Sequence, residues 1–322
     1  MIDLYKIFNS LDNYNKSGYN VADIPSVENH KIGISQDDCP LFFIKTKKSD
    51  ENILSQSFQL ISIQYNKECQ LYSDGDFVEK GSYTLILLKS DILETQKYFI
   101  DIIYLAIKRL SPIPSITEIN FEINQLIELF RNFSKPPVKT IQGVWAEMLV
   151  IEQAKDTDYL VRAWHATPSS IFDFNDGIDK IEVKCTSKDK RIHRFSLSQL
   201  VVTSSSKLLV ASVMTQEVGI GINLFDLRDK IFVALHDKAL IGKVDHILSK
   251  TLGKDIQKSG NYYFDYHLAI DCLQYFDVQL IPSIDGSRIP MQISGIKFDC
   301  DLTGIETADL SVYNSKLFGS LA

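Results

Sequence analysis

The chain has 322 residues, of which 45% are hydrophobic and 23% charged, and its net charge is −7. These values are typical of a globular protein of one or two domains, and the negative charge argues against a generally basic nucleic-acid binder. The acidic N-terminal segment does not have the pattern of a signal peptide, and no apolar run reaches the roughly 18 residues of a membrane span. The five cysteines form no CxxC pair, so they are predicted to be reduced thiols of a cytoplasmic protein.

Residues 1–136 are predicted to form a small α+β domain. Runs rich in β-branched and aromatic residues predict strands at 41–46, 57–65 and 83–88. Apolar residues at helical spacing predict helices over 91–110 and 117–133. Pro136 and Pro137 stop the second helix, so we place a domain boundary there.

Residues 137–322 are predicted to form a larger α/β domain that begins with a helix over 138–155. Its pattern predicts short strands around 160–164, 170–175, 178–186 and 192–197, a short helix near 198–203 and a strong strand at 207–214. A helix over 224–252 and strands near 262–270, 275–281 and 293–300 are predicted to follow. This order of elements indicates a mixed α/β fold.

The predicted strand 178–186 carries a carboxylate and an ammonium on one face. Side chains alternate along a strand, so Glu182 and Lys184 project from the face opposite Ile181 and Val183. Glu182 is the only acidic residue in the chain with Lys two positions later. A plain surface salt bridge is the alternative interpretation.

The turn before this strand decides where Asp173 lies. If Asp176-Gly177 is a two-residue hairpin loop, Asp173 pairs with Lys180 and shares the face of Glu182. A three-residue loop would turn Asp173 to the other face. With the shorter loop, two carboxylates and Lys184 converge. Such oxygen ligands suit Mg²⁺, which activates water and polarises phosphoryl oxygens.

Glu147 is a third candidate carboxylate. Its neighbours at three and four positions along the predicted helix are apolar, and a carboxylate there is costly unless it is paired or binds a metal. The alternative is that Glu147 lies at the edge of the stripe and reaches solvent. His165 is expected to be a hydrogen-bonded structural histidine, with a contact to DNA as the alternative.

A basic run lies beside the candidate carboxylates. Residues 180–194 contain six Lys or Arg residues and two acids, a local balance of +4, which suits a polyanion. A solvated charged face and an ordinary helix N-cap at Ser196 are the alternatives. The predicted nucleic-acid contacts are Lys188, Lys190, Arg191, His193, Arg194, Ser198 and Gln199.

Glu147 in a helix, Asp173 before a turn and Glu182-Val183-Lys184 on the next strand resemble the PD-(D/E)XK nuclease superfamily. The chain is most similar to the bacterial PD-(D/E)XK motif proteins of phage-defence and restriction-modification loci. Ala146 and Ala166 stand where that pattern favours glycine, outside the charged set.

The resemblance implies a restriction-endonuclease-like core, a mixed central sheet flanked by helices, in residues 137–322. It implies a Mg²⁺-dependent DNA endonuclease, with Mn²⁺ as a substitute. Asp173, Glu182 and Glu147 would be metal ligands, and Lys184 would be the catalytic cation. Residues 1–136 would position DNA or a partner, such as another defence protein or a second copy of the chain. The rival hypothesis is a module that binds nucleic acid or a defence complex without cleaving DNA.

Overall fold

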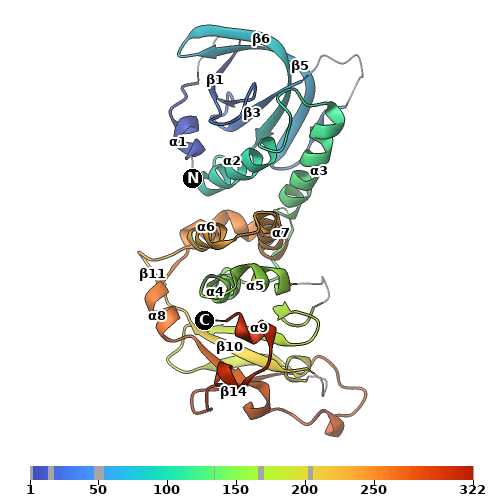
Figure 1. The fold of residues 1–322 in the computed structure, drawn as a ribbon, viewed down its shortest axis with the longest axis vertical. Coiled ribbons are helices and arrows are strands. Elements are labelled where there is room, and N and C mark those ends of the chain that lie inside the picture. The colour runs from blue at the N-terminus through green and yellow to red at the C-terminus, as the bar shows by residue number, and fades with distance from the viewer. Residues whose placement is uncertain are drawn as a thin grey trace. The chain divides into compact units, whose positions relative to one another are not determined.

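The computed structural model describes residues 3–13, 18–46, 54–133, 135–165, 170–201 and 206–321. The chain divides into two compact units, Met1–Lys135 and Pro136–Ala322 (Figure 1). The division falls at the pair of prolines, which interrupts the helical pattern. Among the described helices, none is both long and apolar enough to cross a membrane.

The N-terminal unit is built around a sheet that closes on itself. The strand order is β1-β2-β3-β6-β5-β4, and an additional parallel pairing joins β1 to β5. β5 and β6 form a long hairpin. The strands are β1 (Tyr19–Asp23), β2 (Lys31–Ile34), β3 (Pro40–Lys45), β4 (Gln56–Ser57), β5 (Ile61–Ser73) and β6 (Asp76–Leu88). The helices are α1 (Leu4–Asn9), α2 (Leu93–Ile107) and α3 (Ile116–Asn132). The sequence pattern missed β1 and β2, each of which is five residues or fewer.

The C-terminal unit contains the elements that carry the candidate site. Its helices are α4 (Ile141–Glu152), α5 (Thr157–Ala163), α6 (Leu224–Ala234), α7 (Leu240–Leu252), α8 (Tyr266–Asp271) and α9 (Lys316–Gly319). Its strands are β7 (Phe174–Asn175), β8 (Lys180–Thr186), β9 (Ile192–Ser196), β10 (Leu208–Met214), β11 (Glu217–Val218), β12 (Tyr263–Phe264), β13 (Gln274–Asp277) and β14 (Lys297–Asp301). A 3₁₀ turn, Leu197–Leu200, follows β9.

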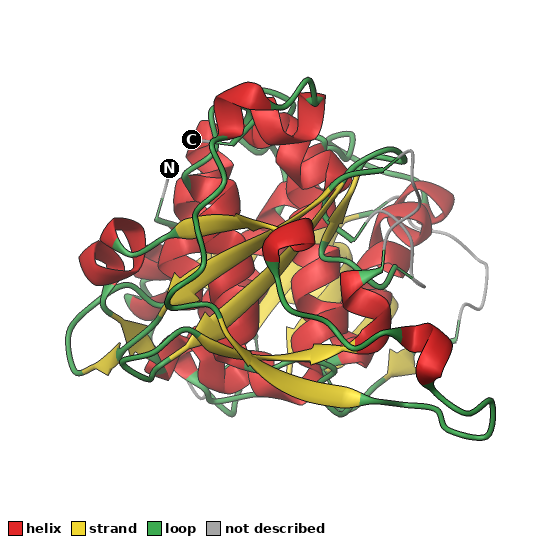
Figure 2. Cartoon of the chain, turned by 90° about the horizontal axis from the view of Figure 1, so that it is seen from below, coloured by secondary structure: helices red, strands yellow, loops and turns green. Residues whose placement is uncertain are grey.

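The central sheet of this unit is mixed, in the order β13-β10-β8-β7. β8 and β10 are parallel, whereas β7 and β13 pair antiparallel to their neighbours. Helix α4 packs against β8, and α6 and α7 pack against α4, so the helices form two layers over one face (Figures 1 and 2). The predicted mixed sheet with flanking helices is therefore present.

The other face of the sheet is covered by a separate antiparallel pair, β9 and β14. Side chains of β10 and β13 meet those of β9 and β14 in one apolar cluster, which includes Phe195, Val210, Phe276 and Leu302. Glu182 is paired with Val210 across β8 and β10, so this charged side chain shares a sheet face with the apolar cluster. The carboxylate of Glu182 is consequently buried, with 3% of the residue exposed.

Three predicted elements are wrong, and in each case an aspartate that accepts backbone hydrogen bonds explains the difference. The segment predicted as a strand at 160–164 lies in helix α5, because the Asp156 carboxylate accepts a hydrogen bond from the Tyr159 amide and starts a helix. The predicted strand at 262–270 is mostly helix α8, which Asp265 caps in the same way. The predicted helix over 224–252 is interrupted between α6 and α7, where Asp158 accepts backbone hydrogen bonds from residues 236 and 237. Part of the predicted helix near 198–203 lies outside the described residues.

Candidate metal centre

Glu147 lies in the middle of α4 and is 2% exposed. Its Oε2 accepts hydrogen bonds from Trp164 Nε1 at 2.7 Å and pairs with His165 Nε2 at 2.9 Å. Its Oε1 accepts from Lys139 Nζ at 2.6 Å. These polar partners explain how a carboxylate can sit inside an apolar helix face, because a buried charge must be paired. The alternative interpretation, an edge position with access to solvent, is therefore wrong.

Lys139 is a member of the site that the sequence analysis missed. It stands just before Thr140, the N-cap of α4, and its ammonium pairs with Glu147 and with Asp173 Oδ1. Burial acts to lower the pKa of Lys139, but the charges of Glu147 and Asp173 outweigh burial and hold this pKa above its usual value. Lys139 is therefore a cation placed between two buried carboxylates.

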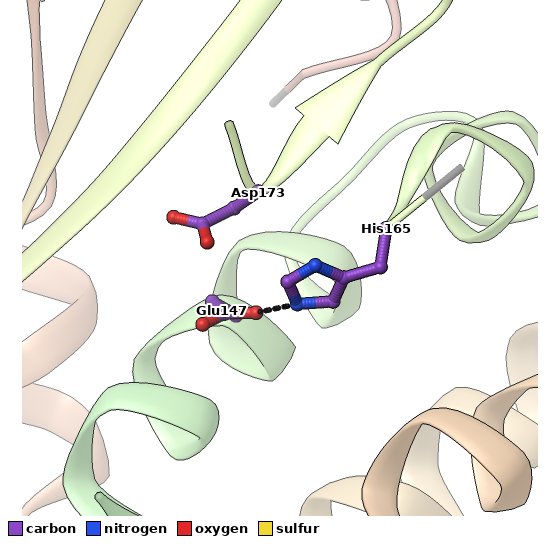
Figure 3. Close-up of side chains that lie close together, drawn as sticks. All are labelled: Glu147, His165 and Asp173. Atoms are coloured by element: carbon purple, nitrogen blue, oxygen red, sulfur yellow. Dashed lines mark hydrogen bonds and ion pairs between the residues drawn. The ribbon is translucent and has the colours of Figure 1, made fainter. Parts of the chain in front are cut away.

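His165 follows α5 and brings its ring to the same carboxylates. Ligand atoms of Glu147, His165 and Asp173 all lie within 4.8 Å of one another, and Figure 3 shows the three side chains converging. The backbone of His165 has a φ of 41°, an unusual conformation for a residue other than glycine. The predicted hydrogen-bonded role is present, and its partner is a site carboxylate.

Asp173 immediately precedes β7, and the loop after it differs from the predicted one. Asn175 pairs with Lys180, so the connection contains four residues, 176–179, and not two. Two extra residues keep the alternation of side chains, so the register now places Asp173 opposite Glu182. The Asp173 side chain binds the edge of β8, where its Oδ2 accepts a hydrogen bond from Val183 N at 2.8 Å.

The long loop is held by Asp176. Its Oδ1 accepts hydrogen bonds from Ile178 N at 2.9 Å and Asp179 N at 2.8 Å, and its Oδ2 accepts from Tyr159 at 2.9 Å. Gly177 adopts a φ of 95°, which glycine tolerates best. The turn predicted at Asp176-Gly177 is therefore present. The hydrogen bonds of Asp176 to residues 178, 179 and 159 accompany a loop that is longer than predicted.

Glu182 and Lys184 project from the same face of β8 and contact each other. Lys184 Nζ lies 2.7 Å from Glu182 Oε1 and donates to Gln199 Oε1 at 3.1 Å. Gln199 Nε2 donates to the same Glu182 oxygen, so Gln199 bridges the two charged side chains. The Lys184 ammonium also lies 5.2 Å from the centre of the Phe195 ring.

Burial, together with mutual repulsion, raises the pKa of two of these carboxylates. Burial, followed by the charge of Asp173, raises the pKa of Glu182 to about 8. Burial and the charge of Glu147 likewise raise the pKa of Asp173, although Lys139 opposes this. For Glu147, burial acts in the same direction, but Lys139 and His165 outweigh it and the pKa lies below the ordinary value. Three acids thus share two ammonium groups.

The donor set fits a divalent cation. Glu182 Oε2 is buried and has no hydrogen-bond partner among the residues that the structure describes. Carboxylate oxygens are the ligands that suit both Mg²⁺ and Mn²⁺. A cation bound by Asp173 and the unpartnered Glu182 oxygen would offset both the burial of these charges and their repulsion, which together raise the two pKa values.

The predicted nucleic-acid residues divide into three groups, of which two are exposed or partly exposed and one is buried. Lys188, Lys190, Arg194 and Ser198 are exposed, although Arg194 is paired with Asp299 at 2.8 Å. Gln199 is partly buried and bridges Glu182 and Lys184 inside the site.

Arg191 and His193 require a correction, because both are buried beneath the surface. Arg191 donates to the backbone and side chain of Ser212, and His193 Nε2 lies 2.7 Å from Ser212 Oγ. Their side chains are used within the core and do not reach a surface ligand. A local charge balance cannot distinguish such buried cations from exposed ones.

The comparison with protein families agrees with this geometry. The family described as "Putative PD-(D/E)XK family member, (DUF4420)" matches residues 5–303. The chain belongs to this family. The match supports the PD-(D/E)XK superfamily and a nuclease-like function, and it spans both units. Searches of curated proteins and of solved structures found no match.

Proposed function

We propose that this DUF4420 protein is a divalent-metal-dependent endonuclease that hydrolyses phosphodiester bonds of DNA. The observation that carries the proposal is the cluster of Glu147, His165 and Asp173 beside the strand that holds the Glu182–Lys184 pair. One buried oxygen of Glu182 has no hydrogen-bond partner among the described residues. A bound divalent cation would supply Lewis-acid polarisation of the phosphate and a more acidic water.

The side chains of the chain have distinct proposed roles around that cation. Asp173 and Glu182 would hold it, and Glu147 would be an accessory ligand fixed by Trp164 and His165. Lys184, held by Glu182 and Gln199, would orient the attacking water or offset charge on the phosphate.

The exposed cations give a path for the DNA backbone toward this site. Lys188 and Lys190 follow the end of β8, the strand that carries Glu182 and Lys184. Arg194 lies on the exposed side of β9. Phosphate contacts from such side chains position DNA without reading its sequence. Expectations of a role in phage defence and of a homodimer come from the resemblance and stay predictions.

A plasmid-nicking assay tests the proposal. Purified wild-type protein should convert supercoiled DNA to open-circular or linear forms with Mg²⁺ or Mn²⁺ and not with EDTA. Asp173→Asn, Glu182→Gln and Lys184→Ala should each reduce the rate by at least about 100-fold, the range of losses for groups that stabilise a transition state. Lys155→Ala, an exposed lysine of the same unit, should cleave like the wild type.

Equal cleavage by all of these proteins would exclude this site as the source of activity. DNA binding that is unchanged in EDTA, without cleavage under any metal condition, would favour the non-catalytic binding module.

A further inference from the structure

Lys139 occupies two of the oxygen atoms that are available to the proposed metal. Its ammonium lies 2.6 Å from Glu147 Oε1 and is paired with Asp173 Oδ1. The chain therefore already contains a cation between two of the three carboxylates.

The Lys139 ammonium and a divalent cation cannot both occupy the site in this arrangement. An ammonium group and a divalent cation repel each other strongly in a buried site, and both would use Asp173 Oδ1 as a partner. Asp173 has little freedom to serve both, because Val183 N holds its other oxygen at 2.8 Å. Binding of the ion must therefore displace Lys139 from at least Asp173.

The local structure allows this displacement. The backbone of residues 138–139 is anchored by hydrogen bonds to Thr251 O, at 2.8 Å from Val138 N and 3.3 Å from Lys139 N. The side chain, in contrast, is 30% exposed and reaches the carboxylates on a flexible four-carbon stem. It can swing into solvent while the backbone stays in place.

We infer that Lys139 is an exchangeable internal cation, which holds the candidate site together in the metal-free protein and competes with the divalent ion for Glu147 and Asp173. This inference rests on the metal site of the proposed function and extends it to the regulation of metal entry. Lys139 thereby lowers the apparent metal affinity while it stabilises the metal-free state.

Calorimetry with Mn²⁺ on the full chain tests the competition directly. Lys139→Met keeps the length of the side chain and removes its charge, and Lys155→Met is the matched control at an exposed lysine. We expect Lys139→Met to bind Mn²⁺ at least about tenfold more tightly than the wild type, because no internal cation must leave. Lys155→Met should bind like the wild type, and Asp173→Asn should lose binding when added to Lys139→Met.

Thermal unfolding gives a second readout that does not depend on activity. In EDTA, Lys139→Met should unfold at a lower temperature than the wild type, because two buried carboxylates lose their cation. Saturating Mn²⁺ should then raise its unfolding temperature by more than it raises that of the wild type.

Equal or weaker Mn²⁺ binding by Lys139→Met, binding that survives Asp173→Asn, or no binding by either protein would overturn the inference. Nicking assays with the same proteins separate it from the proposed function. Tighter Mn²⁺ binding without any DNA cleavage would overturn hydrolysis and leave the exchange of cations intact.

Discussion

At the scale of single residues, Glu147 shows how one buried charge organises its surroundings. Three donors reach it from two parts of the chain: Lys139 before α4, and the consecutive Trp164 and His165 after α5. Each hydrogen bond to an ionised group is stronger than one between neutral groups. Glu147 therefore fixes the end of α5 as well as the site.

Trp164→Phe tests the strength of this arrangement. Trp164 and Trp145 are both fully buried and each donates one indole hydrogen bond, to the Glu147 carboxylate at 2.7 Å and to the Ile222 carbonyl at 3.0 Å. We expect denaturant unfolding to show a loss of about 2–3 kcal/mol for Trp164→Phe and about 1 kcal/mol for Trp145→Phe, since hydrogen bonds to charged groups contribute more.

Glu147→Gln supplies the control for the same prediction. In that background, the cost of Trp164→Phe should fall toward that of Trp145→Phe, because the acceptor is no longer charged. Equal costs of the two tryptophan substitutions in the wild-type background would show that the carboxylate adds nothing to the bond.

At the scale of elements, the β7–β8 connection decides the position of Asp173. The four-residue loop places Asp173 opposite Glu182, whereas the two-residue loop predicted from the sequence would have placed it opposite Lys180. Both loops are even in length, so the side chain keeps the same face. The predicted pairing of Asp173 was therefore wrong by two residues, although the predicted face of the strand did not change.

Gly177→Ala and Gly242→Ala should have opposite effects on stability. A Cβ atom at either position would meet nothing within 4 Å, so the effect is one of backbone conformation. Gly177 has a φ of 95°, and alanine there should cost about 1–2 kcal/mol. Gly242 is exposed within helix α7, where alanine should stabilise by about 0.5–1 kcal/mol. Chemical denaturation measures both, and a loss at Gly242 as large as that at Gly177 would contradict the conformational explanation.

At the scale of the whole molecule, the number of basic residues in a segment does not tell how many of them are exposed. The basic run 180–194 combines exposed Lys188 and Lys190 with cations that serve the interior, such as Arg191 and Lys184. His193 is packed among them at 2% exposure. Burial, with the charges of Lys184 and Arg191, lowers the pKa of His193 to about 4.

The buried His193 should make folding sensitive to acid. The unfolded chain takes up a proton on this histidine near pH 6.5, whereas the folded chain resists protonation until about pH 4. The contribution of neutral His193 to the free energy of unfolding is therefore complete above pH 6.5. It is lost as the pH falls to 4, and the loss amounts to up to about 3 kcal/mol. Between pH 7.5 and 4.5, the free energy of unfolding measured by chemical denaturation should fall less steeply with pH for His193→Gln than for the wild type. An equal pH dependence of the two proteins would contradict the prediction.

The sequence by itself determined the features that depend on near neighbours along the chain. The two-residue period of β8 places Glu182 and Lys184 on one face, and the helical period of α4 places Glu147 among apolar residues. The two prolines and the Asp-Gly pair also marked interruptions correctly, because these residues restrict or permit particular backbone angles.

Only the tertiary structure decided which distant side chains complete the site. Lys139 meets Asp173 from 34 positions away and His165 meets Glu147 from 18, and neither contact has a periodic signal in the sequence. The same packing buried Arg191 and His193, which a charge count places on the surface. Local periodicity follows from backbone geometry, whereas the partner of a buried charge depends on which elements the packed core brings together.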